Sequence, residues 1–198
     1  EDRTATIETT VAEPTYTTEA LQNAGVKEPM GEFSTRLSGS AGRIRNIRLA
    51  ADTIDMSYLA PGETFSMNDT LGPRTRAKGY SSAPVIMNGI MDTGVGGGVS
   101  QVATTLFNAS FFSGLEDVEH KPHSLYISRY PEGREATINY PDVDLKFRND
   151  TDNGALVQMW VGGGSVHARI WGTKQYDVSA RKSGRYAYRS PRTITRSG

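Results

Sequence analysis

Hydrophobic residues recur with a helical period in the stretch "SGSAGRIRNIRLAADTIDMSYLAPGE", residues 38 to 63. They come at steps of three and four residues, at Ile44, Ile47, Ala51 and Ile54. This spacing predicts a helix with one apolar face. Ser40 precedes the helix and is placed to be its N-cap residue.

A second helical stretch runs from about residue 100 to residue 113. Its apolar positions cover most of the helical circumference: Val102, Leu106, Phe107, Ala109, Phe111 and Phe112. A helix that is apolar nearly all round is buried, so this stretch predicts a central helix. Gly114 follows it, at a position where glycine commonly ends a helix.

After Leu115 the hydrophobic pattern changes to a period of two, which is typical of strands. Five stretches separated by turn-forming residues show it: 124–130, 135–140, 143–149, 155–161 and 165–172. Because the helices come first and the strands follow, we expect an α+β fold. It would have a buried central helix packed against a mostly antiparallel sheet.

The 198 residues are enough for one sizeable domain. We interpret residues 1–32 as the tail of a preceding region or a linker, and residues 33–173 as the main domain. Residues 174–198, which are polar and basic, are interpreted as a C-terminal extension or linker. The charged start and polar end indicate a piece of a longer protein.

Composition excludes several classes of function. The 22 basic and 22 acidic residues balance, so the chain has no cationic surplus for nucleic acid or an anionic membrane. Cysteine is absent, which excludes disulfides, thiolate metal sites and a cysteine nucleophile. No run of about 18 apolar residues exists, so we expect no transmembrane segment in this fragment. The pair His120 and His123 has Pro122 between its members and no obvious third ligand, so we predict neither a metal site nor a cofactor.

The stretch "DTGVGGGVS" places four glycines directly before the central helix: Gly94, Gly96, Gly97 and Gly98. A phosphate-binding loop would continue with Gly-Lys-Ser/Thr, which this chain lacks. A dinucleotide-binding fingerprint would need a sixth-position glycine, where this chain has Val99. The glycine strip therefore does not predict nucleotide binding.

A catalytic interpretation starts from Ser100 in the first turn of the central helix. The positive helix end lowers the pKa of a nucleophile there, and N–H groups around residues 99–101 could hold an oxyanion. A base and an acid would follow in chain order. The candidates are His120 and His123 for the base, and Glu135, Asp142 and Asp144 for the acid.

The same residues also allow a structural interpretation. Ser100 could be the N-cap of the central helix, and the glycines could serve only close packing. Asp142 and Asp144 alternate along a predicted strand and could form a solvated face. The residues alone leave both interpretations open.

Several sequence blocks, in this order, resemble the VanW domain. They are "RNIRLAADTID", "LAPGETFSMNDTLGPRTRAKGY" and the run "GVGGGVSQVATTLFNASFFSGL" followed by "HSLYISRY" and "DLKFRN". The resemblance covers about residues 33 to 160, and residues 1–32 resemble the end of the peptidoglycan-binding region that often precedes such domains. It implies an extracytoplasmic, envelope-attached protein of a Gram-positive-type bacterium, of the vancomycin-resistance accessory type.

The resemblance also implies an activity, because some family members are regarded as L,D-transpeptidases that join peptidoglycan stem peptides. Their cysteine nucleophile matches the position of Ser100 here, and His123 falls on the block that carries the general base. Asp144 or Glu135 would orient the imidazole. Substrate binding is carried over to the glycine block and two cations: Gly97, Gly98, Gln101, Arg129 and Arg134, the arginines as clamps for a stem-peptide carboxylate.

The serine at position 100 is compatible with two functions. A hydroxyl needs an active base to take its proton, whereas a thiol is partly ionised at neutral pH. The chain is therefore either an acyltransferase that uses serine or a non-catalytic module that binds peptidoglycan or assists envelope assembly. The serine itself is a natural variant with activity, the mark of a pseudoenzyme, or an engineered change.

Overall fold

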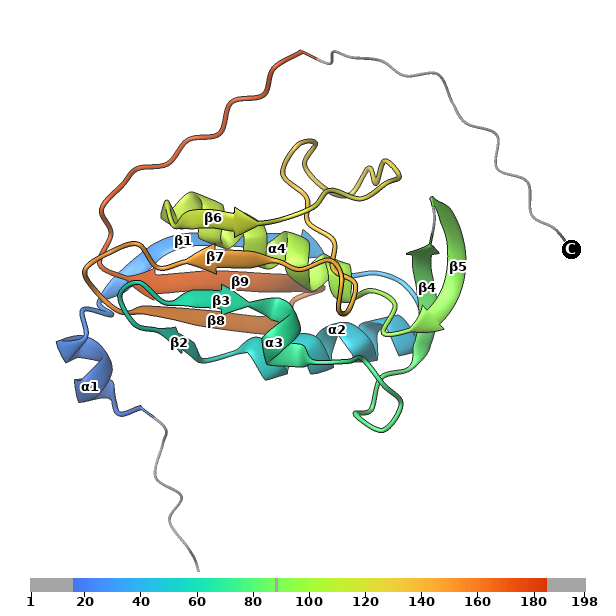
Figure 1. Cartoon of the computed structure of the whole chain (residues 1–198), viewed down its shortest axis with the longest axis horizontal. Helices are drawn as coiled ribbons and strands as arrows, with labels where there is room; N and C mark the ends of the chain where they lie inside the picture. The colour runs from blue at the N-terminus through green and yellow to red at the C-terminus, as the bar shows by residue number, and fades with distance from the viewer. Residues whose placement is uncertain (1–15, 88, 185–198) are drawn as a thin grey trace, which may run out of the picture.

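The computed structural model describes residues 16–87 and 89–184 of the chain (Figure 1). The helices of this described part are α1 (Thr18–Asn23), α2 (Ala41–Ile54), α3 (Met67–Leu71) and α4 (Val99–Ser113). Its strands are β1 (Glu28–Arg36), β2 (Ser57–Leu59), β3 (Thr64–Ser66), β4 (Ser82–Met87), β5 (Ile90–Val95), β6 (Glu116–Glu119), β7 (Lys146–Arg148), β8 (Ala155–Gly162) and β9 (Ser165–Gly172).

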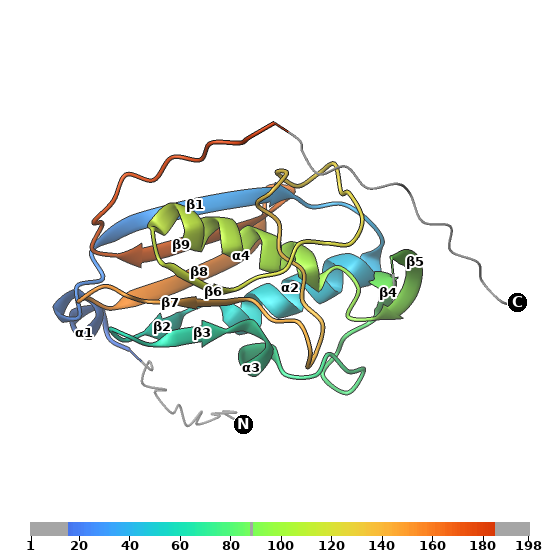
Figure 2. The same cartoon turned by 45° about the horizontal axis from the view of Figure 1, so that its top comes forward.

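The predicted α+β class is confirmed. A four-stranded antiparallel sheet has the order β1-β9-β8-β2, a three-stranded sheet has the order β3-β7-β6, and β4 and β5 form a hairpin. Helix α4 lies on β1 and β9, and α2 lies on β8. Figures 1 and 2 show α4 enclosed between the four-stranded sheet and the chain that runs from β6 to β7.

Both predicted helices are confirmed. In α2 the residues Ile47, Ala51 and Ile54 are fully buried, and the N-cap is Ser40, whose Oγ accepts a hydrogen bond from the N–H of Arg43. Helix α4 is buried along nearly its whole length and ends at Gly114, with φ of 76°. It also buries polar side chains, and within the described residues every buried side-chain polar atom has a hydrogen-bond partner.

Two of the five predicted strands are wrong. Residues 155–161 and 165–172 do form β8 and β9, and 143–149 contains β7. Residues 124–130 form bends and a turn, and residues 135–140 join none of the sheets, although Asn139 makes an isolated bridge with Val143. The backbone of the latter segment bonds instead to side chains of α4, which occupies the place of a neighbouring strand.

Strand β1 was not expected from the sequence, and the boundary proposed between residues 32 and 33 falls inside it. Its partners run antiparallel along β9, from Glu28 opposite Gly172 to Arg36 opposite Ser165. Residues 28–32 are thus part of the four-stranded sheet. The assignments of residues 1–15 and 185–198 as tail and extension lie outside the described residues and stay predictions.

A helix that crosses a bilayer has to be both long and apolar. None of the helices in the described part is long and apolar enough to span a membrane.

Candidate functional site

The glycine strip is held tightly against its neighbours. A Cβ on Gly97 would lie 2.5 Å from the carbonyl oxygen of Ala83, and one on Gly98 would lie 2.6 Å from the Cγ of Arg43. Gly98 also has φ of 100°, a region that side chains disfavour, and it is the N-cap of α4. The strip therefore allows close approach of β4 and α2 to the start of the central helix.

Asn46, fully buried on α2, fixes this approach. Its Nδ2 donates to the carbonyls of Ser81 and Gly97 at 2.9 and 3.0 Å, and its Oδ1 accepts from the N–H of Ser81 at 2.7 Å. Sequence analysis missed Asn46, although an asparagine on the inward face of an otherwise apolar helix is a recognisable signal.

The backbone donors expected to form an oxyanion hole are engaged in the first turn of α4. The N–H of Val99 donates to the carbonyl of Gly96 at 3.3 Å, and that of Gln101 donates to the carbonyl of Gly98 at 2.9 Å. Both N–H groups therefore belong to the hydrogen bonds that begin the helix.

Ser100 is the second residue of α4, so its interpretation as the N-cap is wrong: the cap is Gly98. The Ser100 Oγ shares a hydrogen bond with the Thr137 Oγ1 at 3.0 Å and accepts a long one from the N–H of Ile138 at 3.4 Å. The side chain thus joins α4 to the extended segment 134–138.

Two further residues of α4 continue this junction at four-residue steps. The Thr104 Oγ1 donates to the carbonyl of Ala136 at 2.8 Å and accepts from its N–H at 3.1 Å. The Asn108 Nδ2 donates to the carbonyl of Arg134 at 2.8 Å. Four helical residues rise about 6 Å and two extended residues about 6.6 Å, so helix and segment stay in register.

His123, in the loop after β6, makes a side-chain contact with Glu135 of this segment. The His123 Nδ1 lies 3.0 Å from the Glu135 Oε2, and their side chains are 5% and 14% exposed. Burial lowers the pKa of His123, and Glu135 opposes that shift without cancelling it. At neutral pH the neutral imidazole donates from Nδ1 to the carboxylate and keeps a lone pair on Nε2, as in a base oriented by an acid.

We call His123 and Glu135 the dyad. The dyad and Ser100 contact the same segment, 134–138, through Glu135 and Thr137, but they are not hydrogen-bonded to each other. Glu135 and Thr137 are two residues apart, which is roughly 7 Å along an extended chain. Within the described residues the hydroxyl of Ser100 bonds to Thr137 and Ile138, and not to His123.

The two acids that the family resemblance favours have different partners. Glu135 contacts His123, whereas Asp144 is buried at the start of α3. The Asp144 Oδ2 accepts from the hydroxyl of Ser66 at 2.6 Å and its Oδ1 from the N–H of Asn68 at 2.8 Å. The structure thus brings Glu135 to the histidine and places Asp144 where it caps a helix.

His120 is separate from the dyad. Its Nδ1 lies 2.6 Å from the Asp117 Oδ2, and its ring stacks on Phe107. Among the described residues no group of three histidine, aspartate or glutamate side chains is placed to hold a metal ion.

Gln101, expected to bind substrate, is fully buried. Its Oε1 accepts from the Arg43 guanidinium at 2.6 Å, and its Nε2 donates to the Thr35 Oγ1 and the carbonyl of Arg36, both at 2.9 Å. The amide therefore joins the starts of α2 and α4 to the end of β1.

The two arginines expected to clamp a carboxylate differ in exposure. Arg134 donates to the Asn108 Oδ1 at 2.6 Å, and its guanidinium lies 4.9 Å from the centroid of the Phe112 ring. Arg129 is exposed, and its charge helps to lower the pKa of Tyr130 against the larger upward effect of burial. Of the two, Arg129 is the one open to solvent.

Arg43 and Tyr130 belong to the site and were missed. Arg43 donates to the carbonyl of Ser38 at 2.6 Å as well as to Gln101, and its charge favours ionisation of the nearby Tyr130 hydroxyl. The ring of Tyr130 stacks on His123 with centroids 5.5 Å apart. Arg43 stands in the run "RIRNIR", where spacing alone does not separate the inward arginine from the exposed ones.

Two curated relatives resemble the chain. YoaR of Bacillus subtilis (strain 168) is 35% identical over 182 residues, which cover 91% of this chain and 60% of YoaR. The vancomycin B-type resistance protein VanW of Enterococcus faecalis (strain ATCC 700802 / V583) is 32% identical over 126 residues, which cover 60% of this chain and 44% of that protein. The chain thus spans less than two thirds of either relative, and no solved structure matches it significantly.

The family described as VanW like protein matches residues 42–171, which is more than half of the chain. The matched region includes the glycine strip, Ser100 and the His123–Glu135 dyad. The resemblance carried by these blocks is confirmed, and the chain belongs to the VanW-like protein family.

Proposed function

We propose that this chain is an extracytoplasmic cell-wall protein that binds peptidoglycan stem peptides, and that Ser100 does not carry out acyl transfer. The observation that carries the second part is the bonding of the Ser100 hydroxyl to Thr137 and Ile138. The family and the name of the Enterococcus faecalis relative, which ties that protein to vancomycin resistance, support the link to the cell wall.

The chemical reason lies in what a serine requires. An unactivated hydroxyl is a weak nucleophile until a base takes its proton. The Thr137 hydroxyl next to Ser100 is no base at neutral pH, and the N–H groups of Val99 and Gln101 are already bonded. In this structure the Ser100 hydroxyl thus lacks a contact with a base that would activate it.

Binding is tested by sedimentation with purified sacculi. We expect the chain to be retained in the pellet and to be released by soluble stem peptides in proportion to their concentration. A soluble protein of similar size and charge serves as the control. Retention no greater than that of the control would contradict the proposal.

A second candidate, acyl transfer, is favoured by the His123–Glu135 dyad, since an oriented neutral imidazole is what a general base requires. The Oγ of Ser100 would bond to the peptide carbonyl carbon, and the C–N bond would break. His123 would take the hydroxyl proton and return it to the leaving amine.

Mass spectrometry distinguishes the two candidates. The chain and its Ser100→Cys variant are incubated with muropeptides, and Ser100→Cys combined with His123→Gln is the matched control. We expect no acyl adduct and no new crosslink with Ser100. An adduct on Ser100 would establish acyl transfer and overturn the non-catalytic proposal. An adduct on the cysteine variant alone would mean that the site can be acylated by a peptide and that the Ser100 hydroxyl is too weak a nucleophile.

A further inference from the structure

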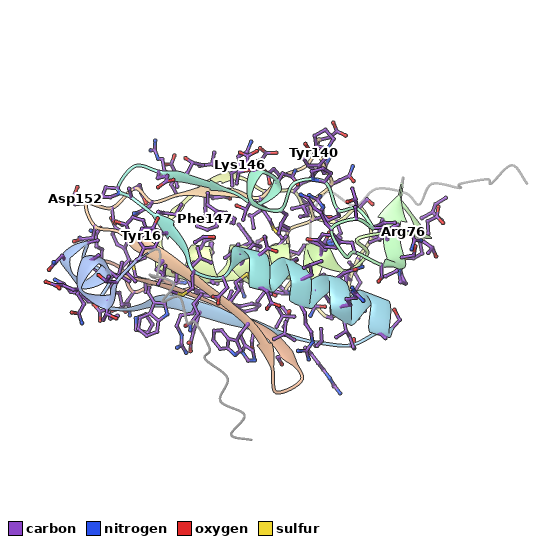
Figure 3. All side chains as sticks on the ribbon, turned by 90° about the horizontal axis from the view of Figure 1, so that it is seen from below. Tyr16, Arg76, Tyr140, Lys146, Phe147 and Asp152 are labelled. Atoms are coloured by element: carbon purple, nitrogen blue, oxygen red, sulfur yellow. The ribbon has the colours of Figure 1, made fainter. Side chains whose placement is uncertain are left out.

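A hollow of about 630 Å³ lies along the outward side of α2, away from the dyad. We name it the α2 groove, and its lining residues are Ala41, Ile44, Arg45, Arg48, Leu49, Asp52, Lys78 and Gly79. Figure 3 shows α2 from this side, with the labelled Arg76 on the neighbouring loop. The helical residues come at steps of three and four, so they form one stripe of α2.

The loop wall of the groove is fixed to the rest of the fold. The Arg45 Nε donates to the carbonyl of Gly79 at 3.0 Å, and the Lys78 Nζ donates to the carbonyl of Leu71 at 2.9 Å. Ile44 and Leu49 are half-buried and give the groove an aliphatic floor. The hollow therefore has a shape set by backbone contacts.

The charge of the groove is unbalanced. Arg45, Arg48 and Lys78 line it, against the single carboxylate of Asp52. The hydrogen bonds of Arg45 and Lys78 go to neutral carbonyls, and neither side chain forms a salt bridge within the described residues. The guanidinium of Arg48 is exposed and makes no hydrogen bond or ion pair with any residue of the described ranges.

This combination of charge and floor selects a class of ligand. A cationic rim attracts an anion, and an arginine fork matches a carboxylate. The aliphatic floor adds a requirement for small apolar side chains next to that anion. A polyol phosphate polymer would satisfy the charge and leave the floor unused, whereas a short peptide with a free carboxylate satisfies both.

We propose that the α2 groove binds the free carboxylate end of a peptidoglycan stem peptide. This inference rests on the proposed function and places the carboxylate contact at Arg48, rather than at Arg129 or Arg134, which the sequence suggested. Ile44 and Leu49 contact the methyl side chains near the carboxylate. Asp52, one helical turn from Arg48, faces the free amino group of the peptide.

The test is calorimetric titration of the whole chain with a synthetic pentapeptide of stem-peptide composition. We expect binding, with an affinity about tenfold or more weaker for Arg48→Gln, because a charged hydrogen bond is lost. The C-terminal amide of the same peptide loses affinity to a similar extent. The control variant is Arg148→Gln, an exposed arginine on β7, which should bind as the unaltered chain does.

The outcomes separate this inference from the function on which it rests. Pentapeptide binding that Arg48→Gln leaves unchanged overturns the α2 groove and retains stem-peptide binding elsewhere. Retention on sacculi without any pentapeptide binding overturns both the groove and stem-peptide binding, and points to the glycan strands as the ligand. Loss of both overturns the groove together with the proposed function. Equal binding of polyglycerol phosphate, with the same sensitivity to Arg48→Gln, overturns the choice of a peptide.

Discussion

At the scale of single residues, several side chains of the site form hydrogen bonds to other elements of the fold. Ser100, Thr104 and Asn108 bond to the segment 134–138, and Gln101 bonds to β1. A buried polar side chain is stable only with such partners, because an unsatisfied group costs about 1–3 kcal/mol. These residues therefore have a role in the fold whatever chemistry the site performs.

Replacing Ser100 by alanine tests this role. The change removes the partner of the Thr137 hydroxyl and the acceptor for the N–H of Ile138. We expect the free energy of unfolding to fall by about 1 kcal/mol, measured by urea denaturation. Ser124→Ala, at an exposed serine, is the control and should change little. Equal stability of the two variants would mean that the Ser100 hydroxyl does not hold the segment.

His123 predicts a dependence of stability on pH. Burial lowers its pKa in the folded chain below the ordinary value of about 6.5, so below that pH the unfolded chain binds the proton more readily. Stability is therefore complete above about pH 6.5 and falls as the pH drops toward the folded-state pKa. The loss approaches about 1.4 kcal/mol for each unit of pKa difference.

The measurement is the urea midpoint at pH 7.5 and at pH 5.5, for the chain and for His123→Gln. Carboxylates titrate near the lower end of this range in both proteins. The difference between the two proteins in how far the urea midpoint falls from pH 7.5 to pH 5.5 therefore isolates His123. We expect the urea midpoint to fall further in the unaltered chain than in His123→Gln. An equal fall in both proteins would contradict the lowered pKa of His123.

At the scale of elements, the glycine strip allows close packing, which is one of the two interpretations that the sequence left open. Gly97 approaches the carbonyls of Ala83 and Pro84 so closely that a Cβ would meet both at 2.5 and 2.6 Å. Because these are backbone atoms, the clash cannot be relieved by a side-chain rotation. The start of α4 and the β4–β5 hairpin are therefore adjusted to each other (Figures 1 and 2).

Gly97→Ala should accordingly be strongly destabilising. We expect a loss of about 3 kcal/mol in the free energy of unfolding, or failure to fold, since the hairpin has to move away from α4. Gly162→Ala on β8 is the matched control, because its Cβ would come no closer than 3.6 Å, to the Trp160 Cδ1. A Gly97 variant as stable as the control would show that the hairpin adjusts freely.

The helices were predictable because their signals are local. The spacing of Ile44, Ile47 and Ile54, with Ser40 as cap, is contained in 15 residues of α2 and its cap. Strand β1 was missed because Pro29 and Gly31 interrupt its pattern, and its register shifts between these two residues. A Cβ on Gly31 would lie 2.5 Å from the N of Ser113, so the glycine serves a contact with α4 that is distant in sequence.

The site was predictable in part for the same reason. Ser100, His123 and Glu135 were found from the order of residue types and the family blocks, and two of them meet. The sequence could not decide between Glu135 and Asp144, because the partners of Asp144, at the end of β3 and the start of α3, lie 78 and 76 residues away. Long-range hydrogen bonds leave no periodicity in the chain.

At the scale of the whole molecule, the domain is closed by strands from both of its ends. Strand β1 and strand β9 pair along their length, so residues 28–36 and 165–172 are neighbours in the sheet. The β1 residue Met30 is buried in the core. Any version of the domain that lacks the start of β1 therefore loses an edge strand and part of the core.

Two shortened chains test this closure. A chain that begins at Tyr16 retains β1 and should unfold in one cooperative thermal transition, followed by circular dichroism. A chain that begins at Phe33 loses the partners of residues 169–172 and the burial of Met30, which alone contributes about 2 kcal/mol. We expect this shorter chain to unfold at a lower midpoint temperature and over a broader temperature range. Identical transitions would place the boundary where the sequence suggested.

The two tryptophans of the chain, Trp160 and Trp171, stand on β8 and β9. The Arg169 guanidinium lies 5.6 and 5.4 Å from their ring centroids, and the ring of His167 stacks on Trp160. This is the sheet surface opposite the buried residues Val166, Ala168 and Ile170, and hence opposite α4. We therefore expect the tryptophan fluorescence of this protein to report the integrity of the sheet rather than occupancy near Ser100, so ligand studies there call for an introduced fluorophore or an isotope label.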